Sequence, residues 1–155
     1  MERSNSDSGL TVQRSVLKTR LQNDKEQIYC SWRKRWVRLT PEEWVRQQLL
    51  HMLVEQFGYP AGLIAVEVQI MVGDAKRRCD AVVYDQRMQP LMLIECKAET
   101  VPLTQRTLDQ AATYNRQLHV PYLMLHNGPT SIVAHVETDK IDYLQRIPTW
   151  NDLSH

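Results

Sequence analysis

Apolar residues between positions 41 and 57 recur every three or four residues, which is the spacing of one face of an α-helix. Thr40 is a preferred N-cap residue, Pro41 suits the first helical position, and Glu43 stands where a capping box needs it. Gly58 follows the last apolar position and suits a C-terminal cap. The pattern therefore predicts a helix over residues 41–57.

The segments that follow are rich in β-branched and apolar residues and are separated by turn residues, as strands are. They predict strands over residues 63–72, 79–84, 91–96, 120–126 and 131–137. A helical pattern predicts a second helix over residues 104–119, between the third and fourth strands. Residues 141–144 are predicted to add one helical turn, and the aromatic and basic stretch 27–39 an edge strand or an ordered lead-in. The predicted order is helix, three strands, helix, two strands.

Length and composition define the class of protein. The 155 residues, 43% of them hydrophobic, suffice for one domain with a buried core, which is predicted over residues 26–155 after a flexible arm at residues 1–25. Three cysteines without a CxxC pair are typical of a reducing compartment, so a cytoplasmic location is expected. No stretch approaches the roughly 20 apolar residues of a membrane span, so no membrane partner is expected.

Basic residues are concentrated in two short clusters, although the net charge of the chain is only +1. An isolated cluster is most often a solvated face, but cations beside Trp32 and Trp36 also suit nucleic acid. Arg46 in the first helix either contacts phosphate or pairs with an acidic residue. The candidate nucleic-acid-binding residues are Arg33, Lys34, Arg35, Arg46, Lys76, Arg77 and Arg78.

The stretch Glu95-Cys96-Lys97, at the end of an apolar strand, is the main candidate for chemistry. Residues two apart on a strand share a face, so the carboxylate of Glu95 and the ammonium of Lys97 emerge together. Placing charged groups beside a packed core is costly unless they are paired or bind a metal. The alternative is that Glu95 and Lys97 form an ordinary exposed ion pair at a strand end.

Pairing of the second and third strands makes the metal hypothesis specific. If they form an antiparallel hairpin centred between Arg87 and Met88, Asp80 lies opposite Glu95. The same register places Val82 opposite Leu93, Tyr84 opposite Leu91 and Arg78 opposite Lys97. Adjacent carboxylates repel each other, and Mg²⁺ or Mn²⁺ between them would remove the repulsion.

Such a site would have defined roles for its members. A metal held by Asp80 and Glu95, with the Cys96 carbonyl as a further ligand, could polarise a phosphoryl oxygen and acidify a bound water. Lys97 could orient or deprotonate that water, or neutralise charge on the phosphate. Two acids are candidates for a third ligand: Glu43, which otherwise completes the capping box, and Glu67 in the first strand.

Gln110 and Tyr114 are four residues apart and therefore share one face of the second helix. They could position a substrate phosphate or the attacking water. The alternative is that they only cover the edge of the sheet.

These motifs together resemble those of the PD-(D/E)XK nucleases, particularly the RecB-like branch with its QxxxY element. Residues 39–46, 58–60 and 122–128 resemble more closely the N-terminal nuclease domain of type I restriction-enzyme R subunits. The resemblance spans roughly residues 29–137. It departs from those subunits in one respect, because no ATP-driven translocase follows in this sequence.

The resemblance implies a restriction-endonuclease-like α/β fold, with an αβββαβ core and a mixed central sheet flanked by helices. It implies Mg²⁺- or Mn²⁺-dependent hydrolysis of DNA phosphodiesters by Asp80, Glu95, Lys97, Gln110 and Tyr114. Glu43 matches the acidic residue of the family's first helix. The expected partners are DNA and either a second copy of the chain or a larger restriction or defence complex. The alternative function is a non-catalytic nucleic-acid-binding or assembly module with the same fold.

Overall fold

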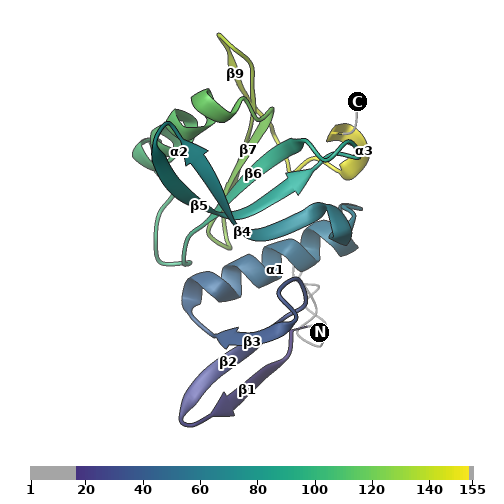
Figure 1. The fold of residues 1–155 in the computed structure, drawn as a ribbon, viewed down its shortest axis with the longest axis vertical. Helices are drawn as coiled ribbons and strands as arrows, with labels where there is room; N and C mark the ends of the chain where they lie inside the picture. Colours follow the sequence, from purple (N-terminus) through teal and green to yellow (C-terminus); the bar gives the residue numbers. More distant parts are fainter. Residues whose placement is uncertain (1–16, 154–155) are drawn as a thin grey trace, which may run out of the picture.

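A computed structural model describes residues 17–153, apart from the side chains of Val72, Tyr114 and Gln117 (Figure 1). Its elements follow one another along the chain as a small N-terminal sheet, a long helix, a large sheet interrupted by a second helix, and a short final helix. They are β1 (Thr19–Gln22), β2 (Lys25–Cys30), β3 (Arg35–Arg38), α1 (Pro41–Glu55), the 3₁₀ turn η2 (Ala61–Leu63), β4 (Ile64–Val72), β5 (Ala75–Tyr84), β6 (Pro90–Cys96), α2 (Gln105–Leu118), β7 (Tyr122–His126), β8 (Ser131–Val136), β9 (Ile141–Tyr143) and α3 (Trp150–Leu153).

The six strands β4 to β9 form one sheet in sequence order. All neighbours are antiparallel except β6 and β7, which are parallel and are joined by α2. The sheet is therefore mixed, and α1, β4, β5, β6, α2 and β7 confirm the predicted αβββαβ core. Among residues 17–153, no helix is long and apolar enough to cross a membrane.

Helix α1 covers one face of the large sheet and α2 covers the other (Figure 1). Leu49, Leu50 and Leu53 of α1 are fully buried in a cluster that includes Ile94 and Met124 of the sheet. On the opposite face, Leu108 and Ala111 of α2 are packed with sheet residues such as Val82, Leu93 and Leu123. The alternation of β5 and β6 thus divides their side chains between two cores, as expected for a sheet buried on both faces.

The start of α1 follows the prediction only in part. The Thr40 hydroxyl accepts a hydrogen bond from the Glu43 amide at 3.0 Å, which is the first half of a capping box. The Glu43 carboxylate, which would complete the box, is engaged by Arg33 and Arg46. At α2, Thr104 and Thr107 form a complete box.

Two predictions about the chain ends were wrong. Residues 141–144 were expected to form a helical turn, but they contain β9, which pairs with β8 through Tyr143 and Ile141. A flexible arm was expected to extend to residue 25, but strand β1 and the start of β2 lie within that range. Residues 1–16 lie outside the described part of the chain.

The N-terminal sheet has the order β1-β2-β3 and lies beside α1 (Figure 1). Asn23 and Asp24 have φ values of 50° and 60°, the left-handed conformation that a two-residue hairpin turn requires. Ile28 and Cys30 of β2 are fully buried, so one face of this sheet belongs to the protein interior. The stretch 27–39, predicted as an edge strand or an ordered lead-in, thus supplies most of β2 and all of β3.

Candidate functional site

The β5–β6 hairpin places the candidate acids side by side. The register pairs Ala81 with Ile94 and Val82 with Leu93, as predicted. Tyr84, however, pairs with Pro90 and not with Leu91, because the register shifts between Val83 and Tyr84. The shift lies on the loop side of the hairpin, so it leaves the opposite end in register, and the regular pairing stops just before Asp80.

Asp80 takes the place of a strand partner at that end. Its Oδ2 accepts a hydrogen bond from the Cys96 amide at 2.7 Å, which holds the carboxylate beside the end of β6. The pairing of β4 with β5 is also interrupted at this level, since it skips from Val66 to Val68. Glu67, the skipped residue, has a φ of 55°, which costs roughly 1–2 kcal/mol in a residue other than glycine. This strained residue lies across from Asp80, between the pairs Val66–Ala81 and Val68–Cys79.

Glu95 lies beside Asp80 and is partly buried. Burial raises the pKa of Glu95 to about 8, and the negative charge of Asp80 and a hydrogen bond with it add to the effect. The positive charge of Lys97 acts in the opposite direction on this pKa. Two carboxyl groups therefore share one partly buried place, and a bound cation would favour the ionised form of both.

Glu95 and Lys97 line a cavity of about 230 Å³ between the sheet and α2. Gln110 of α2 faces them there, and Arg77 and Arg78 of β5 contribute cationic walls. The structure therefore brings together Asp80, Glu95, Lys97 and Gln110. The backbone of Tyr114 lies one turn after Gln110 in α2, but its side chain is outside the described part of the structure.

The backbone of Lys97 is fixed by the neighbouring parallel strand. Its amide donates to the His126 carbonyl at 2.8 Å, one step beyond the last β6–β7 pair, Cys96 with His126. The His126 ring is buried, and its Nδ1 lies 2.7 Å from the Ser131 hydroxyl. Burial lowers the pKa of His126 to about 4. The ring is therefore neutral near pH 7.

Glu43 lies in a group of buried charges. One carboxylate oxygen contacts Arg33 and accepts from Gln47 Nε2 at 2.9 Å, while the other lies 2.9 Å from Arg46 Nη2. The same Arg46 nitrogen lies 3.9 Å from Asp80 Oδ1. Glu43 is thus engaged by cations, and it acts on the site by holding Arg46 next to Asp80.

Glu67 belongs to the same group. Its carboxylate lies 3.4 Å from Arg33, 3.7 Å from Arg46 and 3.8 Å from Arg78. The two acids proposed from the sequence as a third ligand are therefore both paired with arginines. Arg46 also keeps two buried nitrogens, Nε and Nη1, without a hydrogen bond in the described structure.

Glu42 was missed by the sequence reasoning. Partial burial and the charge of Asp80 raise the pKa of Glu42, while Lys97 and Arg46 oppose that rise. Glu42 in turn contributes to the raised pKa of Glu95. These mutual effects show that Glu42 is close enough to Asp80 and Glu95 to influence the site. The only signal for it in the sequence was its position next to Glu43.

The basic residues predicted to bind nucleic acid fall into two groups. Arg33 and Arg46 are largely buried in the charge cluster with Glu43 and Glu67. The exposed group consists of Lys34, Arg35, Lys76, Arg77 and Arg78. Within residues 17–153, no three His, Cys, Asp or Glu side chains are already arranged to hold a metal ion.

Comparison with known proteins identifies one family. The model of the type I restriction enzyme R protein N terminus (HSDR_N) matches residues 41–148 of this chain. That match spans most of the chain, from the first residue of α1 to beyond β9. No curated protein sequence matches the chain.

Among solved structures, the chain is similar to a fragment assigned as an HsdR subunit of a type I restriction enzyme from Vibrio vulnificus YJ016. The TM-score is 0.50 at 20% sequence identity, and the alignment covers 65% of this chain and 22% of that one. At this identity the likeness supports the fold. The aligned part of this chain covers less than a quarter of that fragment.

Proposed function

The chain belongs to the family of type I restriction enzyme R protein N-termini, and from this we propose that it is a metal-dependent nuclease that hydrolyses DNA phosphodiester bonds. The observation that carries the proposal is the convergence of Asp80, Glu95 and Lys97 at one end of the β5–β6 hairpin, beside the cavity that Gln110 also lines. The family and the fold hold without the activity, so the activity needs its own test.

The chemistry of the donor set supports a hard divalent cation. Asp80 and Glu95 offer oxygen ligands only, and their mutual repulsion is the kind that a cation relieves. They would hold Mg²⁺ or Mn²⁺ with the Cys96 carbonyl, and water would complete the shell, as is usual for Mg²⁺. The charge of Glu42, which already acts on Asp80 and Glu95, would add to the attraction for the ion. A bound ion of this kind polarises a phosphoryl oxygen and lowers the pKa of a bound water.

The protein side chains would do the remaining work. Arg77 and Arg78, with Gln110, would hold the substrate phosphate in the cavity. Lys97 would orient the attacking water and neutralise the charge that develops on the phosphate. The water oxygen would bond to phosphorus as the water gives up one proton to solvent, the bond to one ester oxygen would break, and that oxygen would leave and take up a proton.

Cleavage assays with matched variants test the proposal. Plasmid and labelled single-stranded DNA are incubated with Mg²⁺ or Mn²⁺ and with wild type, Asp80→Asn, Lys97→Ala or the control Lys140→Ala. Asn keeps an oxygen for the Cys96 amide, so Asp80→Asn removes charge with little change in structure. We expect wild type and Lys140→Ala to cleave, and both site variants to lose about 100-fold or more. Equal cleavage by all four proteins would attribute the activity to a contaminant and refute the proposal.

A non-catalytic DNA-binding or assembly module is the second candidate. It is favoured by the lack, in the described residues, of three side chains already arranged around a metal. Wild type that binds DNA but never cleaves it, with either metal, would establish this alternative.

The working context is also proposed. The family suggests DNA and a larger restriction complex as partners, and a homodimer would let two sites cut both strands. All three cysteines are free, which suits a cytoplasmic location.

A further inference from the structure

The N-terminal sheet, residues 19–38, has two unlike faces. The inner face carries Ile28 and Cys30, both fully buried. The alternate residues of β2, Gln27 and Tyr29, point outward. Their partners on the neighbouring strands share this outer face: Arg20 and Arg38 lie opposite Gln27, and Trp36 lies opposite Tyr29. The family match begins at residue 41, so this sheet lies outside the matched region.

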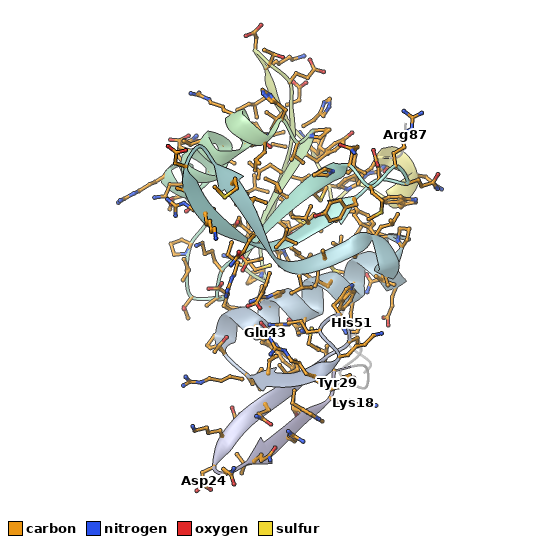
Figure 2. The ribbon with its side chains drawn as sticks, in the orientation of Figure 1. Lys18, Asp24, Tyr29, Glu43, His51 and Arg87 are labelled. Carbon is orange, nitrogen blue, oxygen red and sulfur yellow. The ribbon has the colours of Figure 1, made fainter. Side chains whose placement is uncertain are left out.

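The outer face is cationic. Lys18 adjoins it, since its carbonyl accepts from the Tyr29 amide at 2.9 Å, and Lys25 lies on it opposite Gln22. We call the set the outer basic face; it consists of Lys18, Arg20, Lys25, Tyr29, Trp36 and Arg38. All four of its cations are exposed, and it includes no carboxylate. Asp24 lies at the tip of the hairpin, away from Lys18 and Tyr29 (Figure 2).

This face concentrates positive charge on a chain that is nearly neutral. Residues 17–38 contain seven Lys or Arg and two Asp or Glu, a net charge of +5. Residues 39–155 contain ten Lys or Arg and fourteen Asp or Glu, a net charge of −4. The segment that carries the outer basic face therefore holds an excess of positive charge, which the overall charge of +1 conceals.

The aromatic residues of the face are already occupied. The Arg20 guanidinium lies 4.3 Å from the centre of the Trp36 ring, and Tyr29 meets the same ring edge-on at 5.5 Å. Arg20 also donates to Gln27 at 2.7 Å. Trp36 is thus covered and not free to stack on an unpaired base, so the face offers exposed charge in a fixed arrangement.

We propose that the outer basic face binds the phosphate backbone of duplex DNA and holds it beside the candidate active site. Only Leu39 and Thr40 separate β3 from α1, whose first turn carries Glu42. Arg38, on the outer basic face, is the last residue of β3 and stands four positions before Glu42 in the chain. This inference rests on the proposed action on DNA, and it assigns binding to residues other than those that line the cavity.

The test removes three of the four charges and leaves the Arg20–Trp36 contact intact. The variant Lys18→Gln/Lys25→Gln/Arg38→Gln is compared with Arg87→Gln/Lys140→Gln/Arg146→Gln, which removes three exposed charges elsewhere. Affinity for a short fluorescent DNA duplex is measured by anisotropy in EDTA, across salt concentrations. Each lost phosphate contact lowers the slope of log affinity against log salt by about 0.9, so we expect a decrease of about 3. Between about 50 and 200 mM salt, wild type then loses about 40-fold more affinity than the variant.

The control variant should keep the wild-type slope. Equal slopes for the two triple variants would overturn the inference, and so would a loss seen with single-stranded DNA but not with duplex. Thermal melting checks that both variants are folded, and Lys18→Arg/Lys25→Arg/Arg38→Lys should restore the wild-type slope.

Binding in EDTA is independent of cleavage, so the two proposals can fail separately. Cleavage with unchanged salt slopes refutes the outer basic face only. A salt slope that depends on this face, in a protein that never cleaves, leaves it standing while the nuclease proposal fails.

Discussion

The buried ring of His126 predicts a specific loss of stability in acid. Burial lowers its pKa to about 4, against 6.5 for an exposed histidine. The His126 carbonyl accepts from the Lys97 amide, so His126 is joined directly to the end of β6 that carries the candidate site. The perturbation is therefore a change of pH, with His126→Gln as the variant that cannot titrate.

The sign follows from proton binding in the two states. Below pH 6.5 the unfolded chain takes up a proton that the folded ring refuses, so the contribution of His126 is complete above pH 6.5 and is lost as pH falls toward 4. Applied to these two pKa values, linkage gives a loss of about 2 kcal/mol between pH 7 and about pH 5. The raised pKa of Glu95 acts in the opposite sense over this range, so the wild-type curve alone does not isolate the effect.

The assay is urea unfolding at several pH values in EDTA, for wild type and His126→Gln. We expect the variant to gain about 2 kcal/mol relative to wild type as pH falls from 7 to about 5, whatever their difference at pH 7. His119→Asn is a suitable control, because His119 is exposed at the end of α2 and Asn tolerates its left-handed backbone. Parallel curves for wild type and His126→Gln would refute the reasoning.

Three further predictions follow from the site and its supporting helix. Glu43→Gln should destabilise the protein by about 3 kcal/mol in urea unfolding, because it removes the nearest carboxylate from Arg33 and Arg46 and leaves them only the longer contacts with Glu67 and Asp80. Glu42→Gln should keep stability and lose cleavage; cleavage that is lost with Glu43→Gln and kept with Glu42→Gln would instead make Glu43 the third acid of the site. Thr40→Ala should cost about 1 kcal/mol in the same assay, since it removes the N-cap of α1, whereas Thr113→Ala, at an exposed helical position, should cost less. EDTA should abolish cleavage and added Mn²⁺ restore it; activity that persists in EDTA would contradict the metal requirement.

The register of the β5–β6 hairpin was predictable for the pairs Val82–Leu93 and Ala81–Ile94, but not at the loop, where Tyr84 pairs with Pro90 and not with Leu91. Asp80 and Glu95 are far from that loop, and the shift at Tyr84 lies on the near side of the pairs that position them. The Cys96 amide bond to Asp80 was not predictable, since it depends on where the regular ladder ends.

The sequence could not predict which acidic residue of α1 is the third acid near the site, and the reason is geometric. Glu42 and Glu43 stand four and three residues before Arg46, and both spacings place a side chain next to it on a helix. The choice between them depends on what packs against α1: Arg33, in the loop after β2, forms an ion pair with Glu43. The sequence offers no spacing rule for a contact between separate elements.

Closeness along the chain did not predict which basic residues of the N-terminal sheet share a surface. Arg33 and Arg35 are two apart, yet the first is an interior ion pair and the second is exposed. The helical turn predicted for residues 141–144 was wrong for a similar reason, because such a short stretch takes its conformation from the free edge of β8, with which it pairs.

The strained backbone of Glu67 has a consequence for assembly. Strand β4 is one border of the six-stranded sheet, and a border strand with an unbroken row of amides and carbonyls invites another chain to pair with it. The left-handed residue in the middle of β4 breaks that row, and the opposite border, β9, is only three residues long. Sheet extension from one copy to the next is thus disfavoured at both borders. A second copy, or a larger subunit, would therefore be recognised through side chains.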